Sequence, residues 1–459
     1  MRRLEWGWPM LTREDNELLC RVGPGTPMGE LMRQYWIPCL PSSEFPEPDG
    51  PSKRMMLLGE NFVMFRDTNG AMGAVAEACP HRGASMYFAR VEECGIRCQY
   101  HGWKFDREGT IVDLPTEKRD SRVREHIQNT VKIRSYPCVE VNHMIWVYLG
   151  ARAVPPPFPL FEINTLPLDQ VDPPAIMMEE ANWMQNMEGD LDSVHLNWLH
   201  RRLYADSLAP PLGVRGFWSP DPEPPALDVE RTEYGAYYTS QRAWKDGRNT
   251  WHRINQFIFP FHTMISVGST INLRSFVPLD DHHAMLITHA GNPQGPMPPE
   301  MAIRATNPFG EVGGYLDRTN DPRSYFVTKA NKRNDYMRDL GVEKSVMHCG
   351  IPFVLNLPDR AMTELMCGAD GEPLYDRTAE HLGSTDAMVI AVRAQLINAA
   401  KRFRDAGTPP PNVDDVTLDR VRAASVLLDR DVDWRAHSKV ARDADSGQLP
   451  SDDVPLIID

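Results

Sequence analysis

The chain reads Cys79-Pro80-His81-Arg82-Gly83 and, after the sixteen residues that follow His81, Cys98-Gln99-Tyr100-His101-Gly102-Trp103. Each stretch places one cysteine and one histidine within a few residues of each other. The spacing between the stretches suits a β-hairpin, so the two pairs can lie on adjacent loops and close around one metal centre. Two unrelated core thiols and two ordinary histidines would not be expected to form two such tight mixed pairs.

Two kinds of metal centre use two cysteines and two histidines. Structural zinc sites favour Cys-x₂₋₄-Cys and His-x₃₋₅-His pairs, which are not mixed. In a Rieske [2Fe–2S] cluster, two cysteines hold one iron and two histidines hold the other, so each loop supplies one ligand to each iron. The mixed pairs therefore favour a Rieske cluster, in which Cys79 and Cys98 bind one iron and His81 and His101 bind the other.

The full motif, Cys-Pro-His-Arg-Gly-Ala followed by Cys-x-Tyr-His-Gly-Trp, resembles the Rieske domain of aromatic-ring-hydroxylating oxygenases. Imidazole ligands raise the reduction potential of such a cluster, so it can accept electrons from a ferredoxin-level donor. Arg82, Gly83 and Trp103 are expected to pack around it. Cys94 has no place in the motif and is expected to be an ordinary thiol.

A second group of chemically active residues lies in residues 182–200, which we predict as one helix. Asp192 and His195 are three residues apart and would share a helix face. His195 and His200 are five apart, so both could bind one metal only if the helix were distorted, for example by a π-bulge. Taken alone, the two histidines are more typical of an ordinary helix surface or core.

Beside a Rieske motif, Asp192-x₂-His195-x₄-His200 resembles the mononuclear iron site of Rieske oxygenases. The resemblance implies that His195 and His200 bind Fe(II). It also implies that Asp192 connects His195 to His101 of the partner subunit and carries electrons between the two centres. Such a bridge would also orient the imidazoles through hydrogen bonds.

Non-haem Fe(II) oxygenases complete their two histidines with one carboxylate. The resemblance places this carboxylate late in the chain, where Asp386 precedes an apolar helical pattern, and Asp386 is therefore the predicted third ligand. Glu380 and Asp376 are the alternatives. An aspartate in the first turn of a helix also commonly just compensates the helix dipole.

Across most of its length the chain is similar to the phthalate 4,5-dioxygenase group. The similarity implies a homo-oligomer of α subunits, a trimer or a stacked hexamer, without a β subunit. One segment departs from the group, because the chain has Pro358-Asp359-Arg360-Ala361-Met362-Thr363-Glu364 where the group has a Gln-Asp pair and a second Gln before Glu. The matching segments are Asn16-Glu17-Leu18-Leu19, Gly23-Pro24-Gly25-Thr26-Pro27, the cluster loops, the histidine segment, Lys332-Arg333-Asn334-Asp335-Tyr336 and Asp376-Arg377-Thr378-Ala379-Glu380-His381-Leu382-Gly383.

The pattern of elements predicts an α+β protein. Short strands separated by Gly59-Glu60-Asn61 and Asp67-Thr68-Asn69-Gly70 indicate β-hairpins. Further strands in a block, with helices near 323–339 and 384–404, predict one antiparallel sheet surrounded by helices, in a helix-grip-like arrangement. We expect an N-terminal helical segment (1–36) that packs on the catalytic domain, an all-β Rieske domain (37–152) and a mononuclear iron domain with a C-terminal tail (153–459).

Composition excludes several classes of protein. The chain has 459 residues with 63 acidic and 49 basic side chains, a net charge of −14, which disfavours nucleic-acid and anionic-membrane binding. The start of the chain lacks the apolar core of a signal peptide, and the longest apolar stretch, Met144 to Ala151, is far shorter than a membrane span, so a cytoplasmic location is predicted. Thiols stay reduced there, and the eight cysteines are not expected to form a disulfide framework.

The expected reaction is hydroxylation of an aromatic substrate with O₂, by cis-dihydroxylation. The chain has no nucleotide-binding fingerprint, so electrons must come from a separate NAD(P)H-dependent reductase, with or without a ferredoxin. Carboxylated aromatics would need a pocket arginine. One alternative is a monooxygenase or O-demethylase acting on an aryl ether, and another is a Rieske electron-transfer protein without oxygenase activity. The candidate arginines are Arg201, Arg202, Arg242, Arg253 and Arg274.

Overall fold

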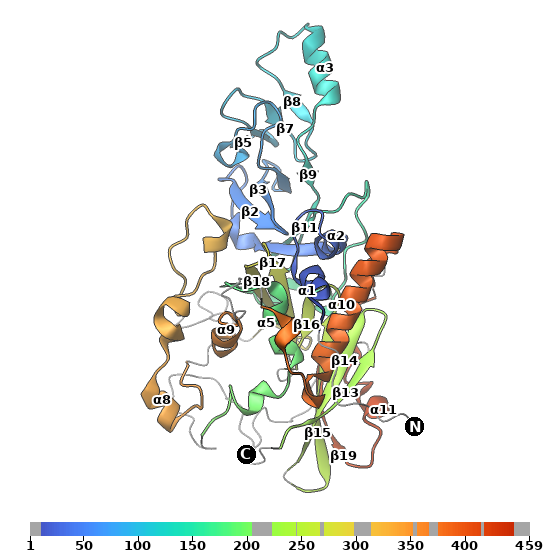
Figure 1. The fold of residues 1–459 in the computed structure, drawn as a ribbon. Helices are drawn as coiled ribbons and strands as arrows, with labels where there is room; N and C mark the ends of the chain where they lie inside the picture. Colours follow the sequence, from blue (N-terminus) through green and yellow to red (C-terminus); the bar gives the residue numbers. More distant parts are fainter. Residues whose placement is uncertain are drawn as a thin grey trace.

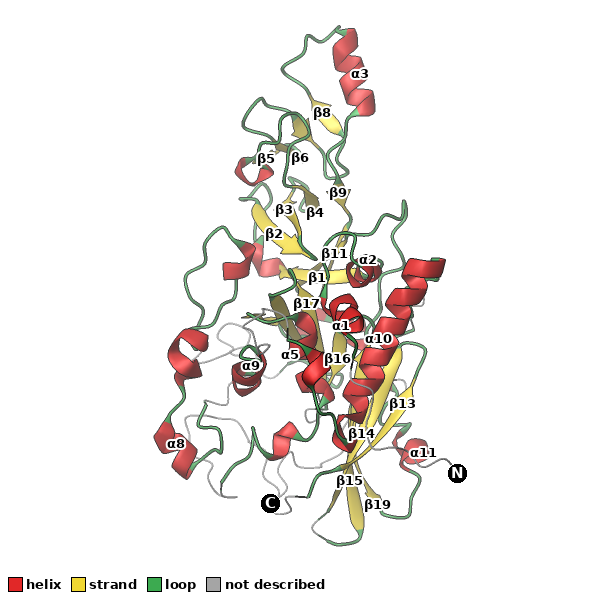
Figure 2. Ribbon diagram, viewed as in Figure 1, coloured by secondary structure: helices red, strands yellow, loops and turns green. Residues whose placement is uncertain are grey.

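The computed structural model describes residues 11–203, 223–244, 246–266, 270–297, 314–351, 356–366, 375–414 and 417–444. Figure 1 shows an upper part built from small sheets and a lower part built around one large sheet. Figure 2 shows that helices are sparse in the upper part and surround the sheet in the lower part. The predicted α+β class, with an all-β domain beside a larger sheet-and-helix domain, is confirmed.

The upper part contains two four-stranded antiparallel sheets and rests on a three-stranded sheet. Tight turns at Gly59 and Gly70, both with positive φ, connect the first three strands as the sequence predicts. The first sheet consists of β2 (Lys53–Leu57), β3 (Glu60–Arg66), β4 (Met72–Ala76) and β9 (Ser135–Tyr136); the second of β5 (Arg90–Glu92), β6 (Gly95–Arg97), β7 (Lys104–Phe105) and β8 (Ile111–Asp113); the third of β1 (Trp36–Pro41), β11 (Met144–Tyr148) and β10 (Cys138–Val141).

The lower part is one antiparallel sheet in the order β12-β18-β17-β16-β15-β14-β13, and β19 also pairs with β15. Its apolar core is continuous with that of the three-stranded sheet and with one face of the β2-β3-β4-β9 sheet, whereas the other face of that sheet shares a second core with the β5-β6-β7-β8 sheet. The strands are β12 (Ala175–Glu179), β13 (Ala226–Arg231), β14 (Gly235–Ala243), β15 (Asn249–Ile258), β16 (His262–Met264), β17 (Ile271–Pro278), β18 (Ala284–Gly291) and β19 (Ala424–Asp429).

Helices α1, α2, α5 and α10 contribute buried apolar residues to the same core as this sheet. The α-helices are α1 (Arg13–Cys20), α2 (Pro27–Met32), α3 (Arg122–Thr130), α4 (Glu162–Thr165), α5 (Trp183–Leu191), α8 (Leu340–Ser345), α9 (Leu357–Thr363), α10 (Ala387–Ala406) and α11 (Trp434–Ser438). The 3₁₀ helices are η1 (Ser42–Glu44), η2 (Met86–Phe88), η3 (Leu168–Gln170), η4 (His195–Asn197), η5 (Pro322–Ser324), η6 (Lys332–Met337), η7 (Arg377–Ala379) and η8 (Ser384–Asp386). None of the helices in the described part of the chain is long and apolar enough to cross a membrane.

Two helix predictions are corrected by the structure. The helix expected over residues 182–200 ends at Leu191, and there is no π-bulge; η4 follows as a separate short turn. Residues 323–339 hold two short 3₁₀ helices rather than one long helix. Asp192 explains the first difference, because its side chain accepts hydrogen bonds from the next backbone N–H groups and so competes with the helix.

Candidate cluster loops and metal centre

The two predicted cluster loops share one backbone design. In the first, Gly83 N donates to Cys79 O at 2.8 Å, and in the second, Gly102 N donates to Cys98 O at 2.9 Å. In each loop the cysteine N also donates to the carbonyl five residues further on, at 2.8 and 2.9 Å. Both turns need a glycine, since the φ angles are +74° and +75°. The similarity of the loops explains how each can present one thiol and one imidazole in the same way.

The structure brings these side chains together. Cys79 and Cys98 are both buried. Burial and the neighbouring Cys98 thiol raise the pKa of Cys79 to about 11. The rings of His81 and His101 lie 4.5 Å apart, and His101 Nδ1 is buried without a hydrogen-bond partner. Two adjacent thiols, two adjacent imidazoles and an orphaned ring nitrogen suit the donor set of a Rieske cluster.

Of the other residues considered near the cluster, Trp103 contacts a proposed ligand, whereas Arg82 and Cys94 are exposed. The Trp103 ring stacks on His81 at 4.5 Å with an interplanar angle of 10°. Arg82 is exposed and lies over the Tyr100 ring, 5.5 Å from its centroid. Cys94 is exposed and accepts a hydrogen bond from Asn69 Nδ2 at 3.1 Å, so it lies apart from the cluster loops. Trp103 is thus the aromatic wall of this site.

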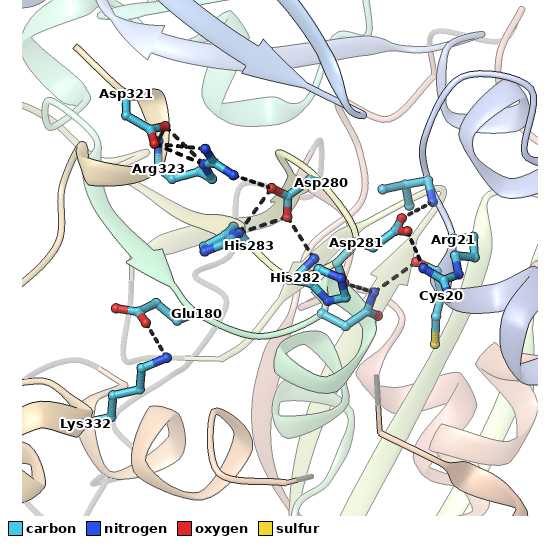
Figure 3. A network of polar contacts seen from close by, with 12 residues as sticks. Cys20, Arg21, Glu180, Asp280, Asp281, His282, His283, Asp321, Arg323 and Lys332 are labelled. Carbon is cyan, nitrogen blue, oxygen red and sulfur yellow. Dashed lines mark hydrogen bonds and ion pairs between the residues drawn. The ribbon is translucent and has the colours of Figure 1, made fainter. Parts of the chain in front are cut away.

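The start of α5 is fixed by polar contacts with two distant segments. Asn182 caps the helix by accepting a hydrogen bond from Met184 N, and its Nδ2 donates to Cys20 O and to Asp281 O at 2.9 and 2.8 Å. Figure 3 shows the surrounding network, in which Arg21 pairs with Asp281 in the turn between β17 and β18. This network holds α5, and hence the histidine segment after it, against the sheet.

A turn after α5, not a distorted helix, brings the two histidines together. Asp192 Oδ1 accepts from Val194 N at 2.7 Å, and Oδ2 accepts from His195 N at 3.3 Å. Asp192 Oδ2 also lies 3.5 Å from His195 Nδ1. The rings of His195 and His200 are 5.0 Å apart. The sequence predicts that Asp192 pairs with His195, but it does not predict the turn in the backbone that follows α5.

Asp359, at the start of α9, lies between the two imidazoles. Its Oδ1 is 3.2 Å from His195 Nε2 and 3.1 Å from His200 Nε2. One ligand atom from each of these three residues lies within 4.8 Å of the others, and no other such group of three or more His, Cys, Asp or Glu side chains occurs among the described residues. Two imidazole nitrogens and one carboxylate oxygen match the ligand set of non-haem Fe(II) oxygenases.

The electrostatics of this group favour a cation at its centre. Burial alone would lower the pKa of His195, but Asp192 and Asp359 outweigh it and raise that pKa to about 10. Burial alone would raise the pKa of Asp359, but the two histidines hold it well below its usual range. The carboxylate therefore stays charged, and a bound divalent cation would replace the proton on His195.

Asp386, the predicted third ligand, lies outside this group. It belongs to η8, where its Oδ2 accepts from Gly383 N at 2.6 Å just before α10 begins. The alternatives also have other contacts: Glu380 pairs with Arg393, and Asp376 accepts from Thr378 N. The signal for Asp359 was in the segment that departs from the phthalate group, because Pro358-Asp359 keeps the aspartate of the group's Gln-Asp pair.

The sheet wall that faces α5 is rich in arginine. Arg274 Nε is 3.0 Å from Asp190 Oδ2, and Arg242 Nη2 donates to Ser193 O at 2.8 Å. Arg253 is only 9% exposed, yet its side chain makes no hydrogen bond or ion pair with any residue that the structure describes. Burial lowers the pKa of Arg253. Among the described residues, its guanidinium therefore has no anion in direct contact, although a buried charge is normally paired.

The arginine-rich face of the sheet lies close to the group of His195, His200 and Asp359. Asp190 is electrostatically coupled both to Arg253 and, on the other side, to Asp359 and His195. Arg201 and Arg202, the remaining candidates, lie after His200 and are tied elsewhere: Arg201 lies over the Trp198 ring, and Arg202 bridges to the segment at Met347. Among the three arginines of this wall, Arg274 pairs with Asp190 and Arg242 donates to Ser193 O, whereas the Arg253 guanidinium has no hydrogen bond with a described residue.

Two family descriptions match the chain. The Rieske [2Fe-2S] domain matches residues 35–137, and the LigXa C-terminal domain-like family matches residues 147–453. The terminal oxygenase of carbazole 1,9a-dioxygenase from Nocardioides aromaticivorans IC177 has the same fold, with a TM-score of 0.53, 17% identity and coverage of 82% of this chain and 97% of that one.

Two curated relatives span nearly the whole chain. The 3-chlorobenzoate-3,4-dioxygenase oxygenase subunit of Comamonas testosteroni is 34% identical over 93% of this chain and 97% of its own length. The phthalate 4,5-dioxygenase oxygenase subunit of Pseudomonas putida is 31% identical over 93% of this chain and 94% of its own. The similarity to the phthalate group is thus confirmed, and the chain belongs to the Rieske oxygenases, as an oxygenase subunit with a Rieske [2Fe–2S] domain and a LigXa-type C-terminal domain.

Proposed function

We propose that this oxygenase subunit oxidises an aromatic substrate with O₂ at an Fe(II) held by His195, His200 and Asp359. The observation that carries the proposal is the approach of one Asp359 oxygen to both imidazoles. Iron bound there would supply O₂ activation, as in other enzymes with two histidines and one carboxylate. We likewise assign the cluster to Cys79, Cys98, His81 and His101, because the structure brings the two thiols and the two imidazoles together.

The protein residues orient the ligands and keep the site dry. Asp192 accepts the backbone N–H of His195 and lies beside its Nδ1, so that Nε2 faces Asp359. Such outer contacts fix the tautomer and the ring orientation of a metal-binding histidine. Burial of Asp359 and His200, whose side chains are 16% and 6% exposed, limits access of water to the centre.

Electron transfer is proposed to cross a subunit boundary. Figure 1 shows that the sheet of β5 to β8, which carries a cluster loop, lies at the end of the molecule away from α9. Asp192 keeps 29% of its side chain exposed, and Trp198 beside it is 50% exposed. We infer that Asp192 connects His195 to His101 of the partner subunit in a homo-oligomer, a trimer or a stacked hexamer.

A separate electron donor is part of the proposal. One solved relative is described as the reduced complex between oxygenase and ferredoxin in carbazole 1,9a-dioxygenase. Among the described residues, we assign the groups of Cys, His and acidic side chains to one [2Fe–2S] cluster and one mononuclear metal centre. The sequence has no nucleotide-binding fingerprint. We therefore infer that an NAD(P)H-dependent reductase, with or without a ferredoxin, delivers the electrons.

The proposed substrate is a carboxylated aromatic. The relatives that span this chain are named for 3-chlorobenzoate and phthalate, which both carry a carboxylate. Arg253 supplies the buried cation that such a group would need. The proposed reaction is cis-dihydroxylation, as the names of these two dioxygenases suggest. A shorter match, 32% over 61% of this chain, is a 5,5'-dehydrodivanillate O-demethylase oxygenase subunit, which makes demethylation the alternative outcome.

Labelled oxygen separates these outcomes. The oxygenase with a generic reductase and ferredoxin is incubated under ¹⁸O₂ with 3-chlorobenzoate, phthalate and a methoxybenzoate. Dihydroxylation is expected to place two labelled atoms in the product, whereas monooxygenation places one and demethylation releases formaldehyde. Reduction of the cluster without oxidation of any substrate, in protein loaded with Fe(II), would instead favour a pure electron-transfer role.

The Arg253→Met variant is expected to raise KM for carboxylated substrates about 10- to 100-fold, since a hydrogen bond to a charged group contributes about 1.5–3 kcal/mol. Methionine keeps much of the buried volume, so kcat for a neutral aromatic analogue should change little. The measurement is steady-state kinetics with a benzoate and with its carboxamide.

The matched control for this prediction is Arg248→Met, which removes an exposed arginine near the start of the same strand. It should leave both KM values unchanged. Equal losses on the benzoate and on the carboxamide in Arg253→Met would show that Arg253 supports the fold rather than the carboxylate.

A further inference from the structure

The proposed metal centre is assembled from two helices that are far apart in sequence. Helix α5 leads into His195 and His200, whereas α9 carries Asp359, 159 residues after His200. The relative position of α5 and α9 therefore sets the distance between the carboxylate and the imidazoles. Any side chain that ties these helices together acts directly on this distance.

Gln185, in the first turns of α5, makes this tie. Its side chain is buried, with the residue 2% exposed. Its Nε2 donates to Thr363 O at 3.0 Å and to Met366 O at 3.1 Å. The last carbonyls of a helix have no partner inside the helix, and this amide binds one of them, Thr363 O, together with Met366 O in the turn that follows α9. Among the residues that the structure describes, these are the hydrogen bonds that join α5 to α9 directly.

Other contacts hold α9 against different elements. Both oxygens of the buried Glu364 are used: Oε1 accepts from Arg360 Nε at 2.7 Å and from Glu180 N at 3.1 Å, and Oε2 accepts from Tyr336 OH at 2.6 Å. These bonds join α9 to β12 and η6 but not to α5. Without Gln185, α9 would remain packed in the fold but would lose its fixed position against α5, the helix that leads into the two histidines.

The contact at the end of α9 reaches Asp359 through one helical turn. Thr363, whose carbonyl Gln185 binds, lies four residues after Asp359, and its Oγ1 donates back to Asp359 O at 3.1 Å. A displacement of this end by a fraction of an ångström is carried along the short helix, because interiors are close-packed and transmit strain.

We propose that Gln185 is a positioning residue that sets the distance between Asp359 and the histidine pair without touching the metal. This inference rests on the proposed function, in which these three residues bind Fe(II). It goes beyond it by assigning the geometry of the centre to a residue that bears no ligand atom. Contacts that orient metal ligands typically change metal affinity about 10- to 100-fold when they are lost.

The test is Gln185→Met in the full chain with its cluster intact. Methionine has a similar length but donates no hydrogen bond, so the bonds from Gln185 to Thr363 O and Met366 O are both lost. We expect Fe(II) affinity of metal-stripped protein, measured by equilibrium dialysis, to fall about 10- to 100-fold. We also expect an altered EPR spectrum of the Fe(II) site after addition of nitric oxide. Gln185→Asn, one methylene shorter, should shift both readouts in the same direction by less.

The matched control is Gln256→Met. Gln256 lies on β15 and is also 2% exposed. Its Nε2 donates to a backbone carbonyl, Arg422 O, at 2.7 Å. Both variants are expected to lower Tm, but only Gln185→Met should change Fe(II) affinity and the nitric oxide spectrum. Equal effects of the two variants on these readouts, or wild-type affinity in Gln185→Met, would overturn the inference.

A further variant separates this inference from the proposed function. If Asp359→Ala binds Fe(II) as tightly as the wild type, the proposed centre is wrong, whatever Gln185 does. If Asp359→Ala loses the metal while both Gln185 variants keep wild-type affinity and spectrum, the centre stands and only the role of Gln185 fails. The visible spectrum of the cluster reports in each variant whether the chain is folded.

Discussion

Asp359→Ala is expected to abolish binding of the mononuclear metal and to lower oxygenase turnover below about 1% of the wild type. The change removes the oxygen that lies 3.1–3.2 Å from both imidazoles, so two neutral donors remain for a divalent cation. Loss of a ligand must cost more than the roughly 10- to 100-fold that loss of an outer contact costs. Metal analysis should show iron for the cluster alone, with its visible spectrum unchanged.

Asp386→Ala is the matched control, because the sequence pattern favours this residue and the structure does not. Its side chain bonds to Gly383 N before α10, so the change removes a helix-capping contact and no metal contact. This variant should keep its mononuclear iron and its turnover, with at most a small loss in Tm. Retention of iron in Asp359→Ala together with its loss in Asp386→Ala would show that the structure has placed the wrong carboxylate at the centre.

The two aspartates show where sequence reasoning stops. Asp386 and Asp359 each stand at the start of a helical pattern, where an acidic residue also compensates the helix dipole. No feature of the neighbouring sequence distinguishes an aspartate that would bind a metal from one that caps a helix. The difference is made by long-range packing, because the amide of Gln185 joins α5 to the end of α9. Such contacts join segments more than 170 residues apart and leave no periodic trace in the sequence.

The cluster loops were predictable for the opposite reason. Their ligands, their glycines and their flanking strands lie within one short stretch, so spacing and turn chemistry are enough. The histidine segment is intermediate. The structure brings His195 and His200 together, but a continuous helix was expected, because apolar periodicity does not reveal that Asp192 bonds to the backbone and ends α5 at Leu191. Local patterns therefore predicted which side chains the structure brings together better than they predicted the backbone that carries them.

Asp192→Asn is expected to preserve both metal centres yet slow turnover about 100-fold, within the range for contacts that orient a ligand. Asparagine keeps the size of the side chain, and its oxygen can still accept from Val194 N. It loses the negative charge that lies 3.5 Å from His195 Nδ1. In a single turnover with prereduced protein, the cluster should stay reduced after O₂ and substrate are added, whereas the wild-type cluster should reoxidise. Normal turnover at unchanged iron content would show that Asp192 is not a bridge.

Slow turnover alone would not show that the bridge crosses between subunits, since Asp192 also orients His195 within its own chain. Co-expression with a second defective chain separates these roles. In His101→Ala the cluster loses a ligand, but the metal centre and Asp192 are intact. In Asp192→Asn the cluster is intact and the bridge is lost. Neither chain alone contains a complete path from a cluster through Asp192 to a metal centre.

A mixed oligomer contains that path only at one kind of interface, where the cluster of an Asp192→Asn chain faces the intact Asp192 of a His101→Ala chain. Random mixing of equal amounts in a head-to-tail ring makes this about one quarter of all interfaces. We therefore expect the mixture to recover up to about a quarter of wild-type turnover, while each variant alone stays near zero. If electrons instead moved within one chain, no mixture could restore activity, because every chain carries a break in its own path. Recovery thus requires that Asp192 connects His195 to His101 of the partner subunit.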